Sequence, residues 1–170
     1  MQETEGLPMN THPDAIELLV NDHRSIERLA DQLDATDDPA EIRGLFLRIV
    51  EELAGHEAVE HQVVFPAFRA SLTGAGDDTL DHRMGEHQEL NELLAEMRGL
   101  APDGFSFTKR ESAFVLQIKE HFRREEETVF ARMRESFSPD QLEELAHRAL
   151  VVKRHAPAFP DPYPRVTASR

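Results

Sequence analysis

The sequence predicts an all-α protein, namely an antiparallel up-down-up-down four-helix bundle with a short fifth helix and a Pro-rich C-terminal tail. Apolar residues recur every three or four positions through most of the 170 residues, and no segment shows sustained strand-like alternation. Groups of proline, glycine and other small residues divide this pattern into five helices. Because short connections favour antiparallel neighbours, the four longer helices predict a bundle.

The first two helices are expected over residues 14–33 and 39–70. Pro13 suits the first turn of the first helix, where the N–H that proline lacks would be unpaired in any case. Asp38 is typical of an N-cap, and Pro39 of the first helical position after it. The small residues that follow the second helix predict a turn over residues 71–76.

Three more helices are expected, over residues 78–98, 108–136 and 138–152. Thr108 and Glu111 have the spacing of a capping box at the start of the fourth helix. Ser138 and Pro139 predict the start of the shorter fifth helix.

The chain is expected to form one domain between two terminal segments. Residues 1–12 are interpreted as an N-terminal arm, residues 13–152 as the helical domain and residues 153–170 as the tail. Residues 155–170 hold four of the ten prolines, so an extended or frayed tail is predicted there.

The composition excludes several classes of site and partner. Asp and Glu number 33 against 19 Lys and Arg, and the net charge of −14 argues against nucleic acid or an anionic membrane as a partner. The absence of cysteine excludes disulfides, iron–sulfur clusters and thiolate zinc sites. The first residues form no apolar run, and no stretch approaches the ~20 apolar residues of a membrane span. We therefore expect a cytoplasmic protein.

One histidine lies near the middle of each long helix, at a position where the apolar pattern predicts a core residue. In the second helix, steps of four and three residues run through Ile42, Phe46, Ile49, Leu53, His56, Glu60, Val63 and Ala67. His23, His87 and His121 are bracketed by apolar residues in the same way in the other three helices.

The spacing H-x-x-x-E occurs twice, at His56 with Glu60 and at His121 with Glu125. Residues four apart share one helix face, so each pair is expected to point into the core. The pairs lie 65 positions apart, and His23 lies 64 positions before His87, which indicates two similar helical hairpins. Buried ionisable groups are costly unless they are paired or bind metal, so a pseudo-symmetric metal site is the leading hypothesis.

Four imidazoles and two carboxylates suit iron, manganese or zinc better than calcium or magnesium. The two carboxylates are well placed to bridge two metal ions. Two six-coordinate ions that share six protein ligands would still need an oxo or hydroxo bridge. They could also keep a position open for dioxygen, peroxide or nitric oxide.

The order of these residues resembles the hemerythrin-like (HHE cation-binding) proteins of the bacterial type. The resemblance runs from Ile16 to Leu150 and includes Asp-His-Arg at 22–24, Val-Val-Phe-Pro at 63–66 and Glu-Glu-Glu-Thr-Val-Phe at 125–130. It implies a four-helix bundle that holds two iron ions. The ligands that it implies are His23, His56, Glu60, His87, His121 and Glu125.

The chain departs from the patterns of this family at several places, among them Ala131, where a proline is expected after Phe130. Oxygen-carrying members have a second histidine on the third helix, four residues from the first, whereas this chain has Arg83 and Asn91 at the two candidate positions. This difference argues against reversible oxygen carriage. Bacterial relatives often have glutamate at the position of His61 and tyrosine at that of Phe65.

Several neighbouring residues carry weaker predictions. His61 is expected at the surface or behind a ligand, and Phe65 is a second candidate for such a supporting position. Glu57 is interpreted first as a solvated glutamate, with an accessory ligand or a hydrogen-bond acceptor behind a ligand as the alternatives. Glu126 and Glu127 are expected to continue the solvated face of the fourth helix.

The function predicted is that of a non-haem di-iron protein that binds, senses or reduces small oxygen or nitrogen species, such as dioxygen, peroxide and nitric oxide. One alternative is a catalase-like enzyme that decomposes peroxide, with no catalytic residue beyond the metal ligands. Another is a helical interaction protein without a functional metal. No nucleic acid or membrane partner is expected.

Overall fold

In a computed structural model, which describes residues 13–72 and 78–159, the chain forms helices and these residues include no strand. The helices are α1 (Ala15–Asp34), α2 (Pro39–Val59), η1 (Glu60–Val64), α3 (Phe65–Ser71), α4 (Thr79–Arg98), α5 (Phe105–Glu125), η2 (Glu126–Phe130), α6 (Ala131–Ser136) and α7 (Pro139–Arg154). The predicted all-α class is thus confirmed for the described residues. The predicted arm at 1–12, most of the turn at 71–76 and the end of the tail at 160–170 lie outside them.

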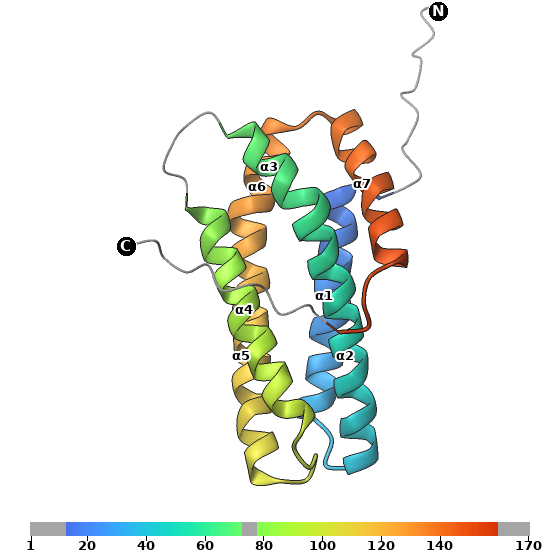
Figure 1. Ribbon diagram of the computed structural model, residues 1–170, viewed down its shortest axis with the longest axis vertical. Coiled ribbons are helices and arrows are strands. Elements are labelled where there is room, and N and C mark those ends of the chain that lie inside the picture. Colours follow the sequence, from blue (N-terminus) through green and yellow to red (C-terminus); the bar gives the residue numbers. More distant parts are fainter. Residues whose placement is uncertain (1–12, 73–77, 160–170) are drawn as a thin grey trace, which may run out of the picture.

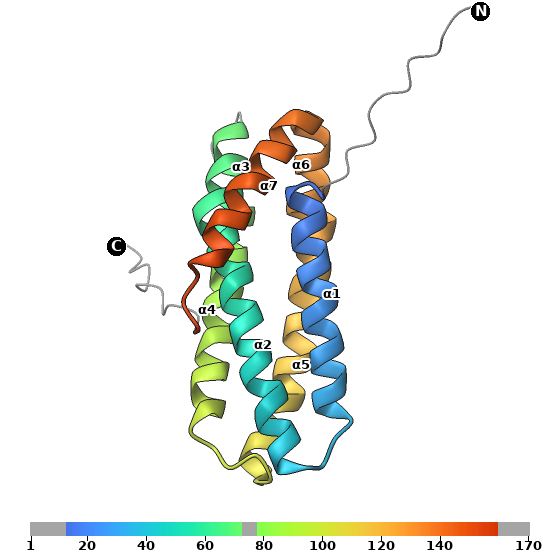
Figure 2. The ribbon, with the colours of Figure 1, turned by 90° about the vertical axis from the view of Figure 1, so that its right-hand side faces the viewer.

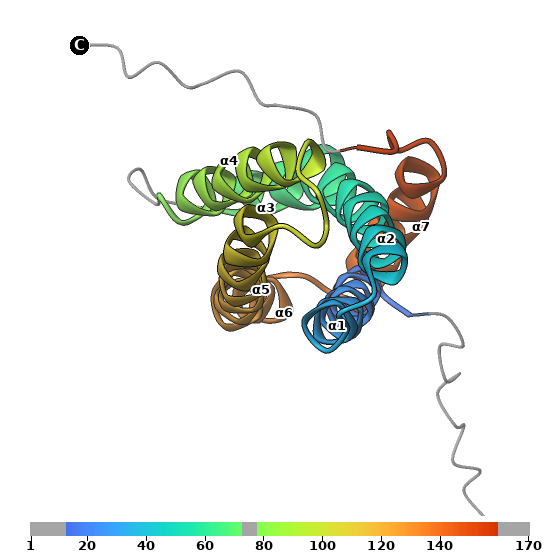
Figure 3. The ribbon, with the colours of Figure 1, turned by 90° about the horizontal axis from the view of Figure 1, so that it is seen from below.

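Four long rods lie side by side (Figures 1 and 2). Two are single helices, α1 and α4. The other two are composite, because η1 joins α2 to α3 and η2 joins α5 to α6 without a break. Seen from below, α1, α2, α4 and α5 surround a common interior, with α7 outside α1 and α2 (Figure 3).

Side chains at several helix starts fix where the helices begin. Asp14 accepts hydrogen bonds from the backbone of Ile16 and Glu17, and Asp38 and Ser138 cap α2 and α7 in the same way. Asp14 is therefore the cap of α1, and the prediction that Pro13 lies in its first turn is wrong.

The capping box predicted at Thr108 is also wrong, because α5 begins three residues earlier, after Gly104. Phe107 is buried in the core and Glu111 is largely buried as well. Continuing the helix toward its N-terminus buries Phe107, and this burial outweighs the local capping signal.

The interior is divided into two apolar clusters. One gathers near the α1–α2 and α4–α5 connections and includes Ile26, Leu53 and Ile118. The other lies toward α3, α6 and α7 and includes Leu19 and Val129. The inward histidines fall between these clusters in every rod, so a polar layer crosses the middle of the bundle.

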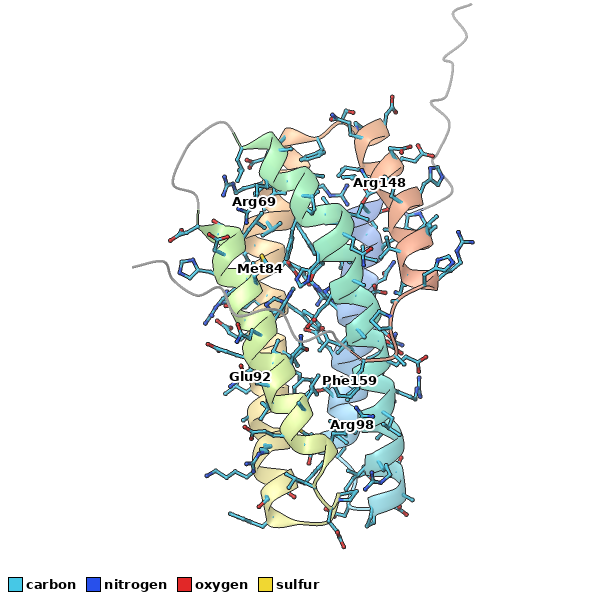
Figure 4. The ribbon with its side chains drawn as sticks, viewed as in Figure 1. Arg69, Met84, Glu92, Arg98, Arg148 and Phe159 are labelled. Carbon is cyan, nitrogen blue, oxygen red and sulfur yellow. The ribbon has the colours of Figure 1, made fainter. Side chains whose placement is uncertain are left out.

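The helix α7 packs on α1 and α2 and ends at Arg154, two residues beyond the predicted end. After α7, Phe159 packs against the apolar cluster near the α1–α2 and α4–α5 connections. The Arg98 guanidinium lies 4.5 Å from the centroid of the Phe159 ring (Figure 4). Within the described residues, the start of the tail therefore folds back onto α4 instead of extending away. None of the described helices has the length and apolar character needed to cross a membrane.

Candidate metal centre

The six predicted ligands meet in the polar layer. His23, His56, Glu60 and Glu125 offer ligand atoms that lie within 4.8 Å of one another, and Glu60, His87 and His121 form a second group by the same measure. Five of the six are 0% exposed, and His121 is 2% exposed. All four rods contribute, and Glu60 belongs to both groups.

Glu60 lies between the two groups. Its Oε1 is 3.2 Å from His56 Nε2, and its Oε2 is 3.2 Å from His87 Nε2. One carboxylate thus faces one imidazole from each hairpin.

Glu125 lies nearer to one group than to the other. Its Oε2 is 3.4 Å from His23 Nε2, but 3.9 Å from His121 Nε2. The same oxygen lies 4.0 Å from His56 Nε2, so apart from His23 it is about equally far from one imidazole of each group.

Two inward histidines are oriented by carboxylates behind them. His23 Nδ1–H donates to Glu126 at 2.8 Å, and His121 Nδ1–H donates to Glu86 at 2.8 Å. An ionised carboxylate can only accept, so each Nδ1 carries the proton and each Nε2 directs a lone pair inward. A carboxylate behind a histidine is a common support for a metal ligand.

These carboxylates are in turn held by arginines. Arg24 donates to Glu126 at 2.6 Å, and Arg124 donates to Glu86 at 2.9 Å. The hydrogen bond from His23 and the neighbouring Arg24 lower the pKa of Glu126. The prediction that Glu126 continues a solvated face is wrong, because its carboxylate turns toward His23.

A third carboxylate links the site to α7. Asp22 Oδ2 lies 3.8 Å from His56 Nδ1, too far for a direct hydrogen bond, and its other oxygen pairs with Lys153. Burial raises the pKa of Asp22, but His56 and Lys153 outweigh burial and lower it overall. The stem of Lys153 passes Gly55, where an added Cβ would lie 3.6 Å from Lys153 Cγ.

His87 differs from the other three, since its Nδ1 lies 2.7 Å from His61 Nε2 and not beside a carboxylate. His61 and Glu126 hold equivalent places, because each follows the glutamate of its hairpin and contacts the first histidine of the other hairpin. The structure thus places His61 behind His87, a predicted ligand, in keeping with one of the two alternatives for His61.

Aromatic rings cover the imidazoles on both sides of the layer. Phe122 stacks on His23 with ring centroids 3.9 Å apart, and Phe130 stacks on the same ring at 5.5 Å. Phe65 stacks on His87 at 5.8 Å. These buried rings limit the access of water to the site, and Phe65 offers no phenol oxygen as a ligand.

Glu57 is buried, and the prediction of a solvated glutamate is wrong. It is 2% exposed, and its Oε2 accepts a hydrogen bond from Asn91 Nδ2 at 2.8 Å. Burial raises the pKa of Glu57 to about 8, and the nearby Glu60 carboxylate contributes. The sequence offered one signal for this pair, since Asn91 lies one turn from His87 on the same face.

The charges within the layer act unequally on the histidines. Burial disfavours the charged form of His56, but Glu60, Asp22 and Glu125 outweigh it and raise its pKa well above the usual value. Burial and neighbouring positive groups lower the pKa of His87. Burial and the Glu60 carboxylate raise the pKa of Glu125 to about 7.

The donor set fits a pair of transition-metal ions. Within the described part of the chain, both carboxylate oxygens of Glu60 and both of Glu125 are buried and accept no hydrogen bond. Such oxygens are costly inside a protein unless a cation lies among them. Four imidazoles beside these carboxylates form the mixed nitrogen and oxygen set that iron, manganese and zinc accept.

Two π-helical turns, which the sequence analysis did not foresee, lie beside the ligands. In η1 the Phe65 N–H bonds to the Glu60 carbonyl, and in η2 the Ala131 N–H bonds to the Glu126 carbonyl, each five residues back. A π-turn contains one residue more than an α-helical turn, so the side of the helix that faces the core shifts by one position after η1. Phe68 is therefore buried at 1% exposure, whereas Ala67 is only partly buried. A signal was present in the consecutive apolar residues of 63–65.

Comparison with known proteins places these features in a family. The family model of the hemerythrin HHE cation-binding domain matches residues 14–133. A solved hemerythrin HHE cation-binding domain-containing protein from Mycobacterium kansasii has a TM-score of 0.74 and 20% sequence identity, over 85% of this chain and 87% of that one. This structural likeness concerns the fold.

A sequence relative is a DNA nickase from Nostoc sp. (strain PCC 7120 / SAG 25.82 / UTEX 2576). It is 30% identical over 125 residues, which are 74% of this chain. The matched region spans 35% of the nickase, so about two thirds of that protein lies outside the match.

Proposed function

Since the chain belongs to the hemerythrin HHE cation-binding domain family, we propose that it is a non-haem di-iron protein that binds, senses or reduces small oxygen or nitrogen species. Dioxygen, peroxide and nitric oxide are the candidate ligands. The observation that carries the proposal is the pair of buried histidine and glutamate groups that share Glu60. When bound, two iron ions would supply redox electrons and an open coordination position for such a molecule.

The chain's own residues prepare the site for this task. Glu126 and Glu86 hold protons on the Nδ1 atoms of His23 and His121, which leaves the Nε2 lone pairs directed inward. Phe122 and Phe130 exclude water from the His23 side of the layer. The buried carboxylates would supply negative charge to offset that of bound metal ions.

The proposal includes a cytoplasmic location and no nucleic acid partner. The nicking activity in the name of the Nostoc relative belongs to that longer protein. A chain with a net charge of −14 would be repelled by the phosphate backbone, which supports a different role here.

Metal analysis tests the central claim. We expect two iron ions per chain after aerobic purification or reconstitution, and an oxo-to-iron absorption band in the near ultraviolet. The Glu60→Ala variant should lose both features, while Glu51→Ala, an exposed change on the preceding helix α2, should keep them. One iron or none in the reconstituted wild type would refute the di-iron assignment and leave a bundle without a functional metal pair.

The enzymatic and binding versions of the proposal differ in turnover. Rapid gas release from added peroxide, lost in His121→Ala, would indicate a catalase-like enzyme. A stable, reversible spectrum with dioxygen or nitric oxide and negligible turnover would indicate binding or sensing.

A further inference from the structure

We infer that residues 3–9, which precede the described part of the chain, pack in extended form along α1 and fill the groove between α1 and the η2–α6 segment. This interaction surface is separate from the proposed metal pair. Three features point to it: the groove itself, a stripe of side chains on α1 and the alternating composition of residues 3–9.

The groove lies where the described chain begins. It has a volume of about 580 Å³, and its apolar lining comes from Pro13, Ile16 and Val20 on one side and from Phe130 and Ala131 on the other. The first turns of α1 lie beside α6 (Figure 2). Burial of apolar surface is favourable, so apolar side chains suit this groove. Because Pro13 is part of the lining, the residues just before it are near enough to supply them.

The groove continues along α1 as a stripe of side chains. Four residues spaced four positions apart share one face of the helix at intervals of about 6 Å, namely Ile16, Val20, Arg24 and Arg28. The first two line the groove, and the two arginines are exposed beyond it. The stripe therefore changes from apolar to cationic halfway along.

Residues 3–9 match this stripe when they run antiparallel to α1. In an extended segment, every second side chain lies on the same side, at intervals of about 6.6 Å. From position 9 backward, these side chains are those of Met9, Leu7, Glu5 and Glu3. Since the intervals of segment and helix nearly agree, the two apolar residues meet the groove and the two glutamates meet the arginines.

The arginines of the stripe suit such partners. The Arg24 side chain is 51% exposed and donates to Glu27 and Glu126 from two nitrogens, and a guanidinium has five N–H donors. The Nε of Arg28 donates to the Arg24 carbonyl, and among the described residues no carboxylate forms an ion pair with Arg28. A glutamate at position 3 would supply that carboxylate.

The link between the segment and α1 has the composition of a turn. Residues 10–14 are Asn10, Thr11, His12, Pro13 and Asp14, and asparagine, proline and aspartate all favour chain reversal. A link this short holds the segment beside its own groove at an effective concentration of about millimolar. The segment of the same chain is therefore favoured as the occupant over a second copy.

The filled groove would shield the support behind His23. Glu126 accepts the Nδ1–H of His23, Phe130 stacks on the same ring, and both residues line the groove. Residues 3–9 would thus act as a strap that keeps water away from these two contacts.

A tryptophan probe tests the docking, because the chain contains no tryptophan. Leu7→Trp places the probe on the side that faces the groove, and Gly6→Trp is the matched control on the opposite side. In the full chain at equal metal content, acrylamide should quench Leu7→Trp about threefold less than Gly6→Trp, because burial of a large apolar side chain favours the docked state. Equal quenching at the two positions would overturn the inference.

A change in the groove tests what protects the probe. Ala131 is exposed at the groove, so Ala131→Glu in the Leu7→Trp chain should raise quenching to the level of Gly6→Trp. The same substitution at Ala95, exposed on α4 away from the groove, should leave quenching unchanged. Protection that survives Ala131→Glu would place the segment elsewhere and refute the docking site.

The proposed pair of Glu3 and Arg28 tests the register. Glu3→Gln and Arg28→Gln change the net charge in opposite directions, yet each should raise quenching of the Leu7→Trp chain about 1.5-fold. The double variant should go no further, because both changes remove one interaction. Arg43→Gln, exposed on α2, should have no effect. Additive effects would contradict the pair, and quenching that depends on protein concentration would place the segment in the groove of a second copy and overturn the strap.

Discussion

The buried Glu57 makes the metal-free protein sensitive to pH in a way that one substitution should remove. Its carboxyl group is 2% exposed and has one hydrogen-bond partner, Asn91. Replacement by glutamine keeps the shape of the side chain and an oxygen to accept the Asn91 hydrogen bond, but it removes the ionisable group. The metal-free Glu57→Gln variant should therefore match wild type in acid and exceed its stability above neutral pH.

The size of the effect follows from the pKa. Burial raises the pKa of Glu57 from 4.5 to about 8, so the folded state binds the proton more tightly than the unfolded state does. The stability linked to that proton is fully present below pH 4.5 and is lost as the pH rises to about 8. At ~1.4 kcal/mol for each pH unit, wild type loses ~5 kcal/mol of unfolding free energy over this range through this residue.

Denaturant unfolding of the metal-free proteins at pH 5 and pH 8 measures the difference. Glu57→Gln should lie within about 1 kcal/mol of wild type at pH 5 and above it by several kcal/mol at pH 8. Glu51→Gln, an exposed change on the same helix, should follow wild type at both pH values. A constant difference between Glu57→Gln and wild type at the two pH values would show that the carboxyl group is not buried in its acid form.

Three further changes test other parts of the structure. Lys153→Met removes the cation that pairs with Asp22 behind His56, so the affinity for iron should fall about tenfold. Transfer of iron to a competing chelator measures this affinity. The control Lys109→Met, on α5, should leave it unchanged. Phe122→Ala empties the space of a fully buried ring stacked on His23 and should cost ~3–5 kcal/mol in denaturant unfolding, whereas Phe105→Ala at an 84% exposed position should cost little. Asp38→Ala removes the cap of α2 and should lower the unfolding free energy by ~1 kcal/mol. Thr108 lies inside α5 and caps nothing, so Thr108→Ala should lower it by less than ~0.5 kcal/mol. Equal losses in the two variants would contradict the helix starts described above.

The helices and the ligand residues could be read from the sequence because burial leaves a periodic pattern. His56 and Glu60 occupy positions where that pattern predicts apolar residues, and such buried groups are costly unless they are paired or bind a metal ion. The pattern also located the ends of helices where a polar side chain dominates, as at Asp38. It failed at Thr108, where a buried phenylalanine one residue earlier decides the start of the helix.

The helical pattern could not show the π-turns, because a period of 3.6 residues contains no signal for a local insertion. After Glu60 the structure buries Val64, Phe65 and Phe68, whereas the regular steps predicted Val63 and Ala67. Val63 is buried as well, so the apolar pattern alone allowed both registers. The hydrogen bond from the Phe65 N–H to the Glu60 carbonyl, five residues back, selects between the two registers. Only the three-dimensional structure reveals this bond.

The supporting residues were missed because each acts on a histidine far away in the chain, although their positions repeat. Asp22 precedes His23 but faces His56, and Glu86 precedes His87 but contacts His121. Residues that appear to be solvated neighbours of one ligand thus support another ligand across the bundle.

The same repeat makes the difference between the surroundings of His23 and His87 depend on few residues. Glu126 behind His23 is a carboxylate, and the equivalent residue behind His87 is His61, a base whose pKa burial lowers to about 4. A carboxylate strengthens the imidazole it supports, whereas a neutral imidazole does so less. His87 would therefore be the less basic donor if it bound a metal ion. The hairpins therefore share a ligand pattern but not an equivalent chemistry, and the residue at position 61 contributes to that inequality from outside the ligand set.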